Sequence, residues 1–247
     1  MKAFYTLTCG SLAGFDWIES RGIGMSVSNL PHSSGNRVWR TSLTPAEAGT
    51  RIKEVIDFYS SRGLPFLWMV GPRDSPPDLS KRLEEAGLVR GEGTRMAMDL
   101  RQLKQPAEPS GFESKKVEDL QTLETFSRLA PEAYGVAVSL QEAASSWLRR
   151  MGLNQNLYQY LGCLGGKPVA TSLVLLCSGV AGLYYVATLP EARGKGIGSA
   201  ITAAPLIEAR EEGYRIAILQ STKLGYPVYA RLGFKETRKG VSYSLKR

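Results

Sequence analysis

The sequence predicts a mixed α/β protein built from two similar units in tandem. The clearest sign is a repeat: segments 64–70 and 214–220 both have the pattern of short buried strands that follow a helix closed by a glycine. Each strand is followed by a turn, a short amphipathic helix that ends in a Gly-apolar pair, and a closing strand. A polar stretch at 106–111 contains Pro and Gly and lacks apolar periodicity. We therefore expect units at 1–105 and 112–247 joined by this linker.

The composition is that of a globular protein with a sizeable core: 247 residues, 43% hydrophobic and 22% charged. The three cysteines, Cys9, Cys163 and Cys177, are an odd number without a C-x-x-C pair. This argues against a disulfide framework and a zinc site, and it predicts buried packing cysteines in a reducing, cytoplasmic compartment. The single histidine, His32, excludes most metal centres, so no metal is expected.

Membranes and nucleic acids are not expected partners. No apolar run approaches the ~18 residues of a membrane span, and the N-terminal stretch is too weakly apolar for a secretory signal. The net charge is +8, but the basic residues are scattered, without the runs or interleaved aromatics of nucleic-acid-binding modules. An anionic small ligand is compatible with this charge.

The second unit is expected to begin with a helix around 117–129. Two strands joined by a Gly-Gly hairpin turn at 165–166 come next, and a third strand ends near Thr188. A glycine-rich turn then opens a helix around 197–212, whose apolar residues trace one face. Pro205 interrupts this helix, so we expect either a kink there or a helix held by tertiary packing.

The glycine-rich turn, Arg-Gly-Lys-Gly-Ile-Gly, is the most informative segment. A strand enters it and a helix leaves it, so unpaired backbone N–H groups and the positive end of the helix dipole converge there. Gly194, Gly196 and Gly198 permit close approach of a ligand, while Arg193 and Lys195 add positive charge. This arrangement suits a phosphate, although a purely structural turn is the alternative. The spacing fits neither a Walker loop nor a dinucleotide fingerprint.

With its flanking residues, this turn resembles the acetyl-coenzyme A motif of the GNAT N-acetyltransferase superfamily, R-x-x-G-x-G at the start of a helix. Segments 168–170 and 229–234 resemble, in the same order, the family's strand after the hairpin and its Y-x-x-x-G-F terminal helix. The first unit looks like a degenerate copy, because its counterpart of the turn, 43–50, has one glycine and no basic residue before Arg51. The resemblance implies a central mixed β-sheet flanked by helices, with an acetyltransferase domain at 112–247.

The resemblance also implies a reaction: acetyl-coenzyme A gives its acetyl group to a primary amine of a small molecule or peptide, by direct attack in a ternary complex. It places the cofactor in a V-shaped opening between two central strands, where the Val186 N–H would stabilise the oxyanion. Tyr229 would be the acid for the departing thiolate, with core packing as its alternative role. The implied cofactor contacts are Val186, Ala187, Thr188, Arg193, Gly194, Lys195, Gly196, Ile197, Gly198, Ser199 and Ser221.

The sequence does not identify the general base, the acceptor or the oligomeric state. Strand 183–188 carries no carboxylate, which leaves Glu132, Glu142 or a water chain as candidates for the base. Tyr184 and Tyr185 are expected to alternate across that strand, so that one faces the opening. Ser221 and its neighbour Thr222 could instead cap the following helix. Because no base is identified, a non-catalytic coenzyme A sensor is the alternative function.

Overall fold

The structure is a computed structural model that describes residues 15–28, 31, 33 and 35–246. Cys9, His32 and the N-terminal stretch 1–14 therefore lie outside the described residues. The chain divides into two compact units. Among the described residues, we call Thr94–Arg238 the C-terminal unit, and residues 15–93 together with those from Lys239 onward the N-terminal unit.

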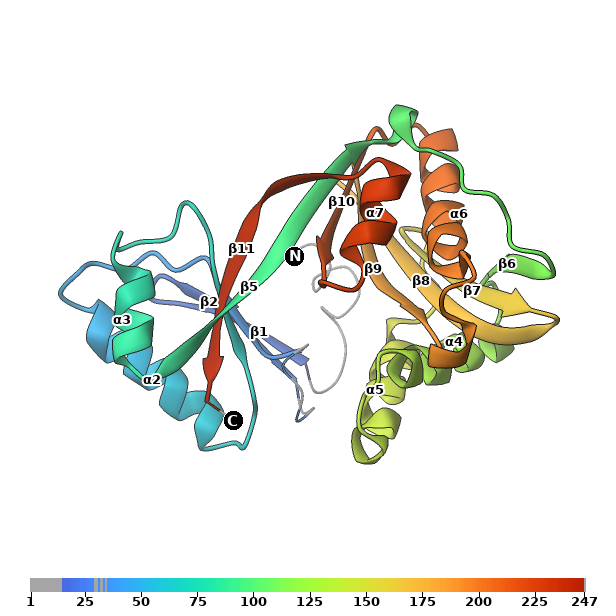
Figure 1. The fold of residues 1–247 in the computed structure, drawn as a ribbon. Helices are drawn as coiled ribbons and strands as arrows, with labels where there is room; N and C mark the ends of the chain where they lie inside the picture. Colours follow the sequence, from blue (N-terminus) through green and yellow to red (C-terminus); the bar gives the residue numbers. More distant parts are fainter. Residues whose placement is uncertain (1–14, 29–30, 32, 34, 247) are drawn as a thin grey trace. The chain divides into compact units, whose positions relative to one another are not determined.

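These limits differ from the predicted units 1–105 and 112–247 because two long strands are shared between the units. Strand β5 (Leu88–Asp99) begins in the N-terminal unit and ends in the C-terminal unit, and β11 (Lys235–Leu245) continues in the reverse direction (Figure 1). The predicted linker at 106–111 contains no helix or strand, but it lies inside the C-terminal unit.

The N-terminal unit is a small sheet with two helices. Its strands follow the order β1-β2-β3-β4-β11-β5. The elements specific to it are β1 (Phe15–Ser20), β2 (Ile23–Ser28), β3 (Arg37–Trp39), α2 (Ala48–Ser60), β4 (Leu67–Val70) and α3 (Leu79–Glu85). As predicted, a glycine with φ of +64°, Gly63, follows the helix that precedes the buried strand.

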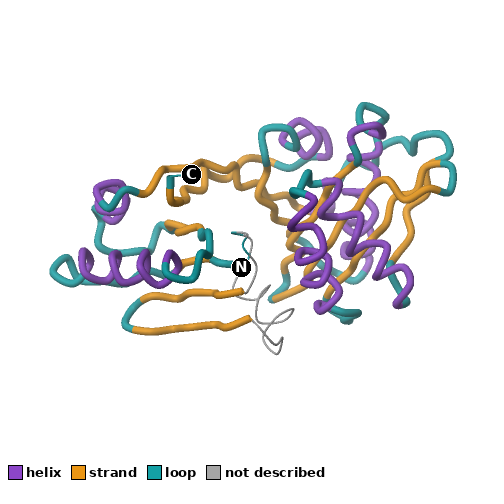
Figure 2. Tube along the Cα trace, turned by 90° about the horizontal axis from the view of Figure 1, so that it is seen from below, coloured by secondary structure: helices purple, strands orange, loops and turns teal. Residues whose placement is uncertain are grey.

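The C-terminal unit contains a mixed sheet in the order β11-β5-β10-β9-β8-β7-β6, in which only β9 and β10 are parallel to each other. Helices flank it, as Figures 1 and 2 show. Its strands are β6 (Phe112–Lys116), β7 (Leu157–Leu164), β8 (Lys167–Cys177), β9 (Val180–Thr188) and β10 (Ile216–Ser221). Its helices are α4 (Leu120–Ala133), α5 (Val138–Met151), α6 (Ile197–Glu211) and α7 (Tyr226–Leu232), with short 3-10 turns at Leu100–Gln102 and Pro190–Ala192.

The closing strands of the predicted repeat pair across the two halves of the sequence. In the N-terminal unit, β4 pairs with residues 241–243 of β11. In the C-terminal unit, β10 pairs with residues 94–99 of β5. Each buried strand of the repeat is therefore bordered by a closing strand that comes from the other half of the sequence.

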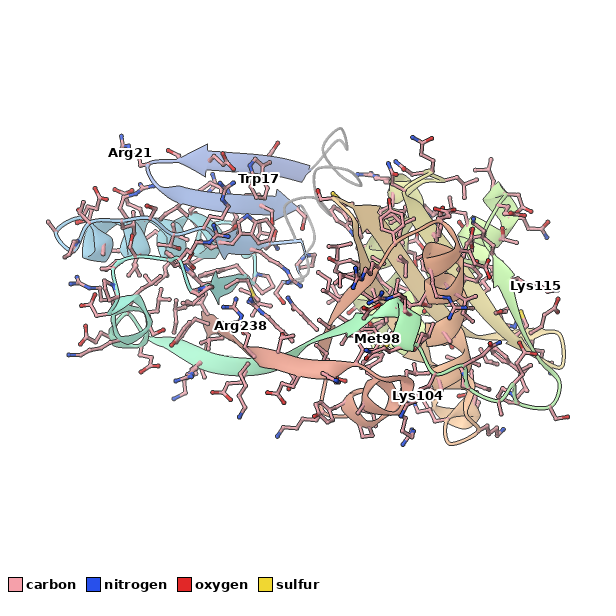
Figure 3. All side chains as sticks on the ribbon, turned by 90° about the horizontal axis from the view of Figure 1, so that it is seen from above. Trp17, Arg21, Met98, Lys104, Lys115 and Arg238 are labelled. Carbon is pink, nitrogen blue, oxygen red and sulfur yellow. The ribbon has the colours of Figure 1, made fainter. Side chains whose placement is uncertain are left out.

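The core of the C-terminal unit holds α6 and α7 against the sheet. Apolar side chains of both helices pack with those of β8, β9 and β10, and Met98 at the end of β5 belongs to the same cluster (Figure 3). Helix α6 runs through Pro205, and this proline is buried in the core of the unit. Cys163 is buried, whereas Cys177 is partly exposed. None of the helices in the described part of the chain has the length and hydropathy needed to cross a bilayer.

Candidate functional site

The two parallel strands at the centre of the C-terminal unit, β9 and β10, are paired over only part of their length. The pairing runs from Val180 opposite Ile216 to Gly182 opposite Ile218. Beyond these residues, no register pair joins the two strands within the described chain. The pairing therefore ends where the family resemblance implies an opening between the central strands.

Strand β9 contains a β-bulge just beyond this point. Tyr185 and Val186 together oppose a single residue of β8, Ser172, and Tyr185 has a left-handed φ of +48°. The bulge interrupts the alternation of faces, because Val186 packs on the same core cluster as Leu183, three positions earlier. The regular alternation of the strand is therefore interrupted between Leu183 and Val186.

The glycine-rich turn presents free backbone donors at the start of α6. Gly194 and Gly196 have φ of +76° and +80°, and Gly196 is the N-cap without a side-chain cap. Within the described chain, no acceptor bonds the backbone N–H groups from Gly194 to Gly198. A Cβ added to Gly194 would meet nothing within 4 Å, and one added to Gly196 would meet only Pro109, at 3.5 Å. The turn is thus both open and rich in donors, as an anion site requires.

The two basic residues of the turn, Arg193 and Lys195, differ in their side-chain contacts. The Arg193 guanidinium donates from Nε to the carbonyl of Thr188 (2.9 Å) and from Nη2 to the carbonyl of Ala133 (3.3 Å). Because both acceptors are neutral, Arg193 braces the turn while its positive charge stays uncompensated. Lys195 is exposed and has no ion-pair partner among the described residues. The N–H of Ser199 bonds the carbonyl of Gly196 (3.0 Å), so a cofactor contact of Ser199 would have to use its side chain.

The other predicted cofactor contacts lie on both sides of the turn. Ala187 and Thr188 follow the bulge and are partly exposed, and Ile197 is buried under the first turn of α6. Ser221 ends β10, is 7% exposed, and donates from Oγ to the carbonyl of Thr222 (2.8 Å). The Oγ1 atom of Thr222 accepts a hydrogen bond from the N–H of Gly225, the residue before α7 (3.1 Å). Thr222 therefore closes the turn before α7, whose N-cap, Gly225, has no side-chain cap.

Tyr229 lies on α7 and is nearly buried, with 9% of its surface exposed. Its ring meets Phe234 edge to face, with 6.0 Å between ring centroids. Gly225 makes room for the ring, because a Cβ there would lie 2.8 Å from Cε2 of Tyr229. Burial raises the pKa of Tyr229 to about 12. The phenol is thus protonated at neutral pH, and it is a weaker acid than an exposed tyrosine.

A tyrosine that the sequence reasoning missed, Tyr134, stands beside the bulge. It is the C-cap of α4, is 51% exposed, and its ring meets that of Tyr185 edge to face, with 6.1 Å between centroids. Desolvation raises the pKa of Tyr134, and the neighbouring hydroxyls of Tyr229 and Tyr185 raise it further. The residue as a whole is half exposed, but its hydroxyl is desolvated and lies near those of Tyr185 and Tyr229. The sequence feature that could have pointed to Tyr134 is its position directly before Gly135, the glycine that follows α4.

The two candidate bases, Glu132 and Glu142, lie on α4 and α5. Glu142 on α5 is in an ion pair with Arg149, which also contacts Glu124 on α4. Glu132 is an exposed residue of α4. In the described ranges, no group of three His, Cys, Asp or Glu side chains is placed to hold a metal ion.

Comparison with known proteins finds a family that part of this chain resembles. Residues 155–236 match the family model described as an acetyltransferase (GNAT) domain. The chain is 27% identical over 239 residues to a mycothiol acetyltransferase from Saccharomonospora viridis, covering 92% of this chain and 70% of that protein.

Solved structures share the fold. A GCN5-related N-acetyltransferase from Kribbella flavida has a TM-score of 0.71 at 19% identity, over 95% of this chain and 90% of that one. A tandem GNAT protein from the clavulanic acid biosynthesis pathway has a TM-score of 0.61 at 16% identity, over 90% of this chain and 77% of that one.

Proposed function

We propose, from the premise that residues 155–236 are a GNAT acetyltransferase domain, that this chain transfers an acetyl group from acetyl-coenzyme A to a primary amine. The observation that carries the proposal is the junction of a bulged strand with a glycine-rich helix start. Free N–H groups from Gly194 to Gly198 offer a phosphate site, and the bulge at Val186 offers a separate donor further along β9.

The phosphate end of the site is supported by charge as well as by geometry. The pyrophosphate of acetyl-coenzyme A would accept the N–H groups of Gly196, Ile197 and Gly198 at the positive end of α6. Lys195 and the uncompensated guanidinium of Arg193 add attraction, although Arg193 acts mainly by bracing the turn. The pantetheine arm would then run along β9 past Thr188 and Ala187.

The transfer step would take place at the bulge. As the amine attacks the thioester carbonyl, negative charge develops on its oxygen, and the Val186 N–H would donate to that oxygen. The C–S bond then breaks, the sulfur leaves as a thiolate, and the proton that the amine nitrogen loses passes through water to that thiolate, so the products are an amide and free coenzyme A. Tyr229 would donate a hydrogen bond to this sulfur. Because its pKa is about 12, complete proton transfer from Tyr229 to a thiolate with a pKa of ~8.5 is uphill.

The absence of an assigned base supports a second candidate, a coenzyme A sensor without turnover. Glu142 is held in its ion pair with Arg149, and no other carboxylate is assigned to the reaction. In this alternative, the same turn binds the cofactor and no acetyl group leaves it. The two candidates share the binding site and differ only in the release of free thiol.

An acceptor screen separates the two candidates. The full chain is incubated with acetyl-coenzyme A and panels of amino acids, polyamines, aminoglycosides, peptides and an acceptor related to mycothiol, since a relative carries that substrate in its name. Free thiol is followed with a chromogenic reagent, and the acetylated amine is identified by mass spectrometry. Acceptor-dependent thiol release supports the transferase. Tight binding without release for every acceptor class supports the sensor.

A further inference from the structure

Thr171, on β8, contacts the bulge through its side chain. Its hydroxyl donates a hydrogen bond to the carbonyl oxygen of Tyr185 at 2.9 Å. Thr171 is fully buried, with 0% of its surface exposed, so water cannot replace the hydroxyl at this position. The bonded carbonyl belongs to the residue whose backbone has the left-handed φ of +48°. The hydroxyl therefore holds the part of β9 that departs from regular strand geometry.

This hydrogen bond also sets the direction of the next N–H. The carbonyl of Tyr185 and the N–H of Val186 belong to one planar trans peptide group, so they point in opposite directions. Thr171 holds the carbonyl toward β8, and β9 lies between β8 and β10 in the sheet. The Val186 N–H therefore points away from the Thr171 hydroxyl. Pairing between β9 and β10 has already ended at Gly182.

We propose that Thr171 is a positioning residue for acyl transfer: its hydroxyl orients the Tyr185–Val186 peptide so that the Val186 N–H meets the thioester oxygen. The inference rests on the proposed function. Thr171 does not touch the substrate in this role, keeps its proton throughout, and acts only through the peptide group that it bonds. The role requires a hydroxyl at this position, which serine retains and valine lacks.

Ser172 provides a matched control on the same strand. It is also fully buried, and it lies directly opposite the bulge. Its hydroxyl has no hydrogen-bond partner in the described part of the chain. Ser172→Ala therefore removes a buried hydroxyl from the adjacent position without removing a hydrogen bond to Tyr185.

The direct readout is the infrared stretching frequency of the thioester carbonyl in isotope-labelled acetyl-coenzyme A bound to the full chain. A hydrogen bond from Val186 lowers this frequency, and no acceptor is needed to observe it. In the wild type and in Ser172→Ala we expect the lowered frequency. Thr171→Val should lose it while the dissociation constant of unacetylated coenzyme A stays unchanged, because the turn at α6 is intact. Thr171→Ser should restore it.

Turnover with an acceptor from the screen should follow the same order. Loss of one oxyanion donor costs ~10²- to 10³-fold in turnover, and misdirection of the donor should cost ~10- to 100-fold. If Thr171→Val proves unfolded by thermal denaturation, Thr171→Ala replaces it in both measurements.

A hydroxyl-free variant with the wild-type frequency and turnover would overturn the proposal. So would a Thr171→Ser protein as impaired as the valine protein, because packing would then explain the loss. A wild-type protein that binds acetyl-coenzyme A without any frequency change would refute the role of Val186 itself. One that binds no acetyl-coenzyme A would refute the proposed function, so the failures are distinguishable.

Discussion

Replacement of Gly196 by glutamate tests the phosphate site with little damage to the fold. Gly196 has φ of +80°, where an L-residue costs roughly 1 to 2 kcal/mol. An added Cβ would meet only Pro109 at 3.5 Å, which is an ordinary contact. A carboxylate at a helix N-terminus returns ~0.3 to 1 kcal/mol through the helix dipole. Gly196→Glu should therefore stay folded, with a free energy of unfolding lowered by about 1 kcal/mol.

The effect on binding should be larger than the effect on stability. The introduced carboxylate lies at the helix start where the pyrophosphate is proposed to bind. Two unit charges about 4 Å apart interact by ~1 kcal/mol in water and ~4 kcal/mol near a protein surface. Repulsion of that size raises the dissociation constant by ~5-fold to ~10³-fold.

Calorimetric titration of acetyl-coenzyme A into the folded proteins measures this change. Gly196→Ala is the matched control, because it introduces the same backbone strain without charge and should lose much less affinity. Wild-type affinity in Gly196→Glu would refute the placement of the phosphates. Equal losses in the alanine and glutamate proteins would refute the electrostatic argument and leave only a conformational one.

Further predictions concern the acid, its support and the number of sites. Tyr229→Phe should keep its affinity for acetyl-coenzyme A and lower turnover ~10²- to 10⁴-fold; unchanged turnover would return Tyr229 to core packing. Burial raises the pKa of Tyr229 to about 12, so the folded protein favours the neutral phenol. The resulting contribution to the free energy of unfolding is present below the ordinary pKa of ~10 and is lost as the pH rises toward 12. Denaturant unfolding at a series of pH values measures this loss. Gly225→Ala should lower both the melting temperature and turnover, because the added Cβ would lie 2.8 Å from the Tyr229 ring; an unchanged melting temperature would contradict that crowding. Calorimetry should give one acetyl-coenzyme A per chain. At the start of α2 the carboxylate of Glu47 accepts a hydrogen bond from the N–H of Thr44 (2.8 Å), whereas the corresponding turn of the C-terminal unit has open donors. Two equivalent binding sites per chain would refute this prediction.

Local patterns predicted several elements of the C-terminal unit, but not strand β6, with which the second unit begins, nor helix α5. The hairpin turn at 165–166, the helix that starts at Ile197 and the glycines that follow helices are all written in short stretches of sequence. Their conformations follow from backbone freedom and apolar periodicity within about ten residues. The family motifs lie in these same stretches, which is why the resemblance could be drawn from them.

Strand partners could not be predicted in the same way. The closing strands near 96–100 and 241–245 have the right composition for a sheet, but composition does not name a neighbour. In the structure, residues 94–99 border β10 and residues 241–243 border β4, so the predicted domain limits shift. Such pairing depends on contacts between residues far apart in the chain. The alternation of side chains along a strand is the same whichever strand it pairs with, so it does not identify the partner.

The detailed geometry of the site could not be predicted from the sequence for a related reason. The bulge at Tyr185 exists because β9 has one more residue than β8 at that point, a count that requires the register of both strands. Tyr134 joins the site only because α4 ends beside that bulge. The charge of Arg193 was predictable, but its bonds to the carbonyls of Thr188 and Ala133 were not.

The most direct test is a crystal structure of the full chain with acetyl-coenzyme A. We predict that the pyrophosphate oxygens accept hydrogen bonds from the backbone N–H groups of Gly196, Ile197 and Gly198. We also predict that the thioester oxygen lies within hydrogen-bonding distance of the Val186 N–H, with the sulfur near the hydroxyl of Tyr229. A cofactor whose phosphates bind away from the start of α6, or whose thioester lies away from the bulge in β9, would contradict the account.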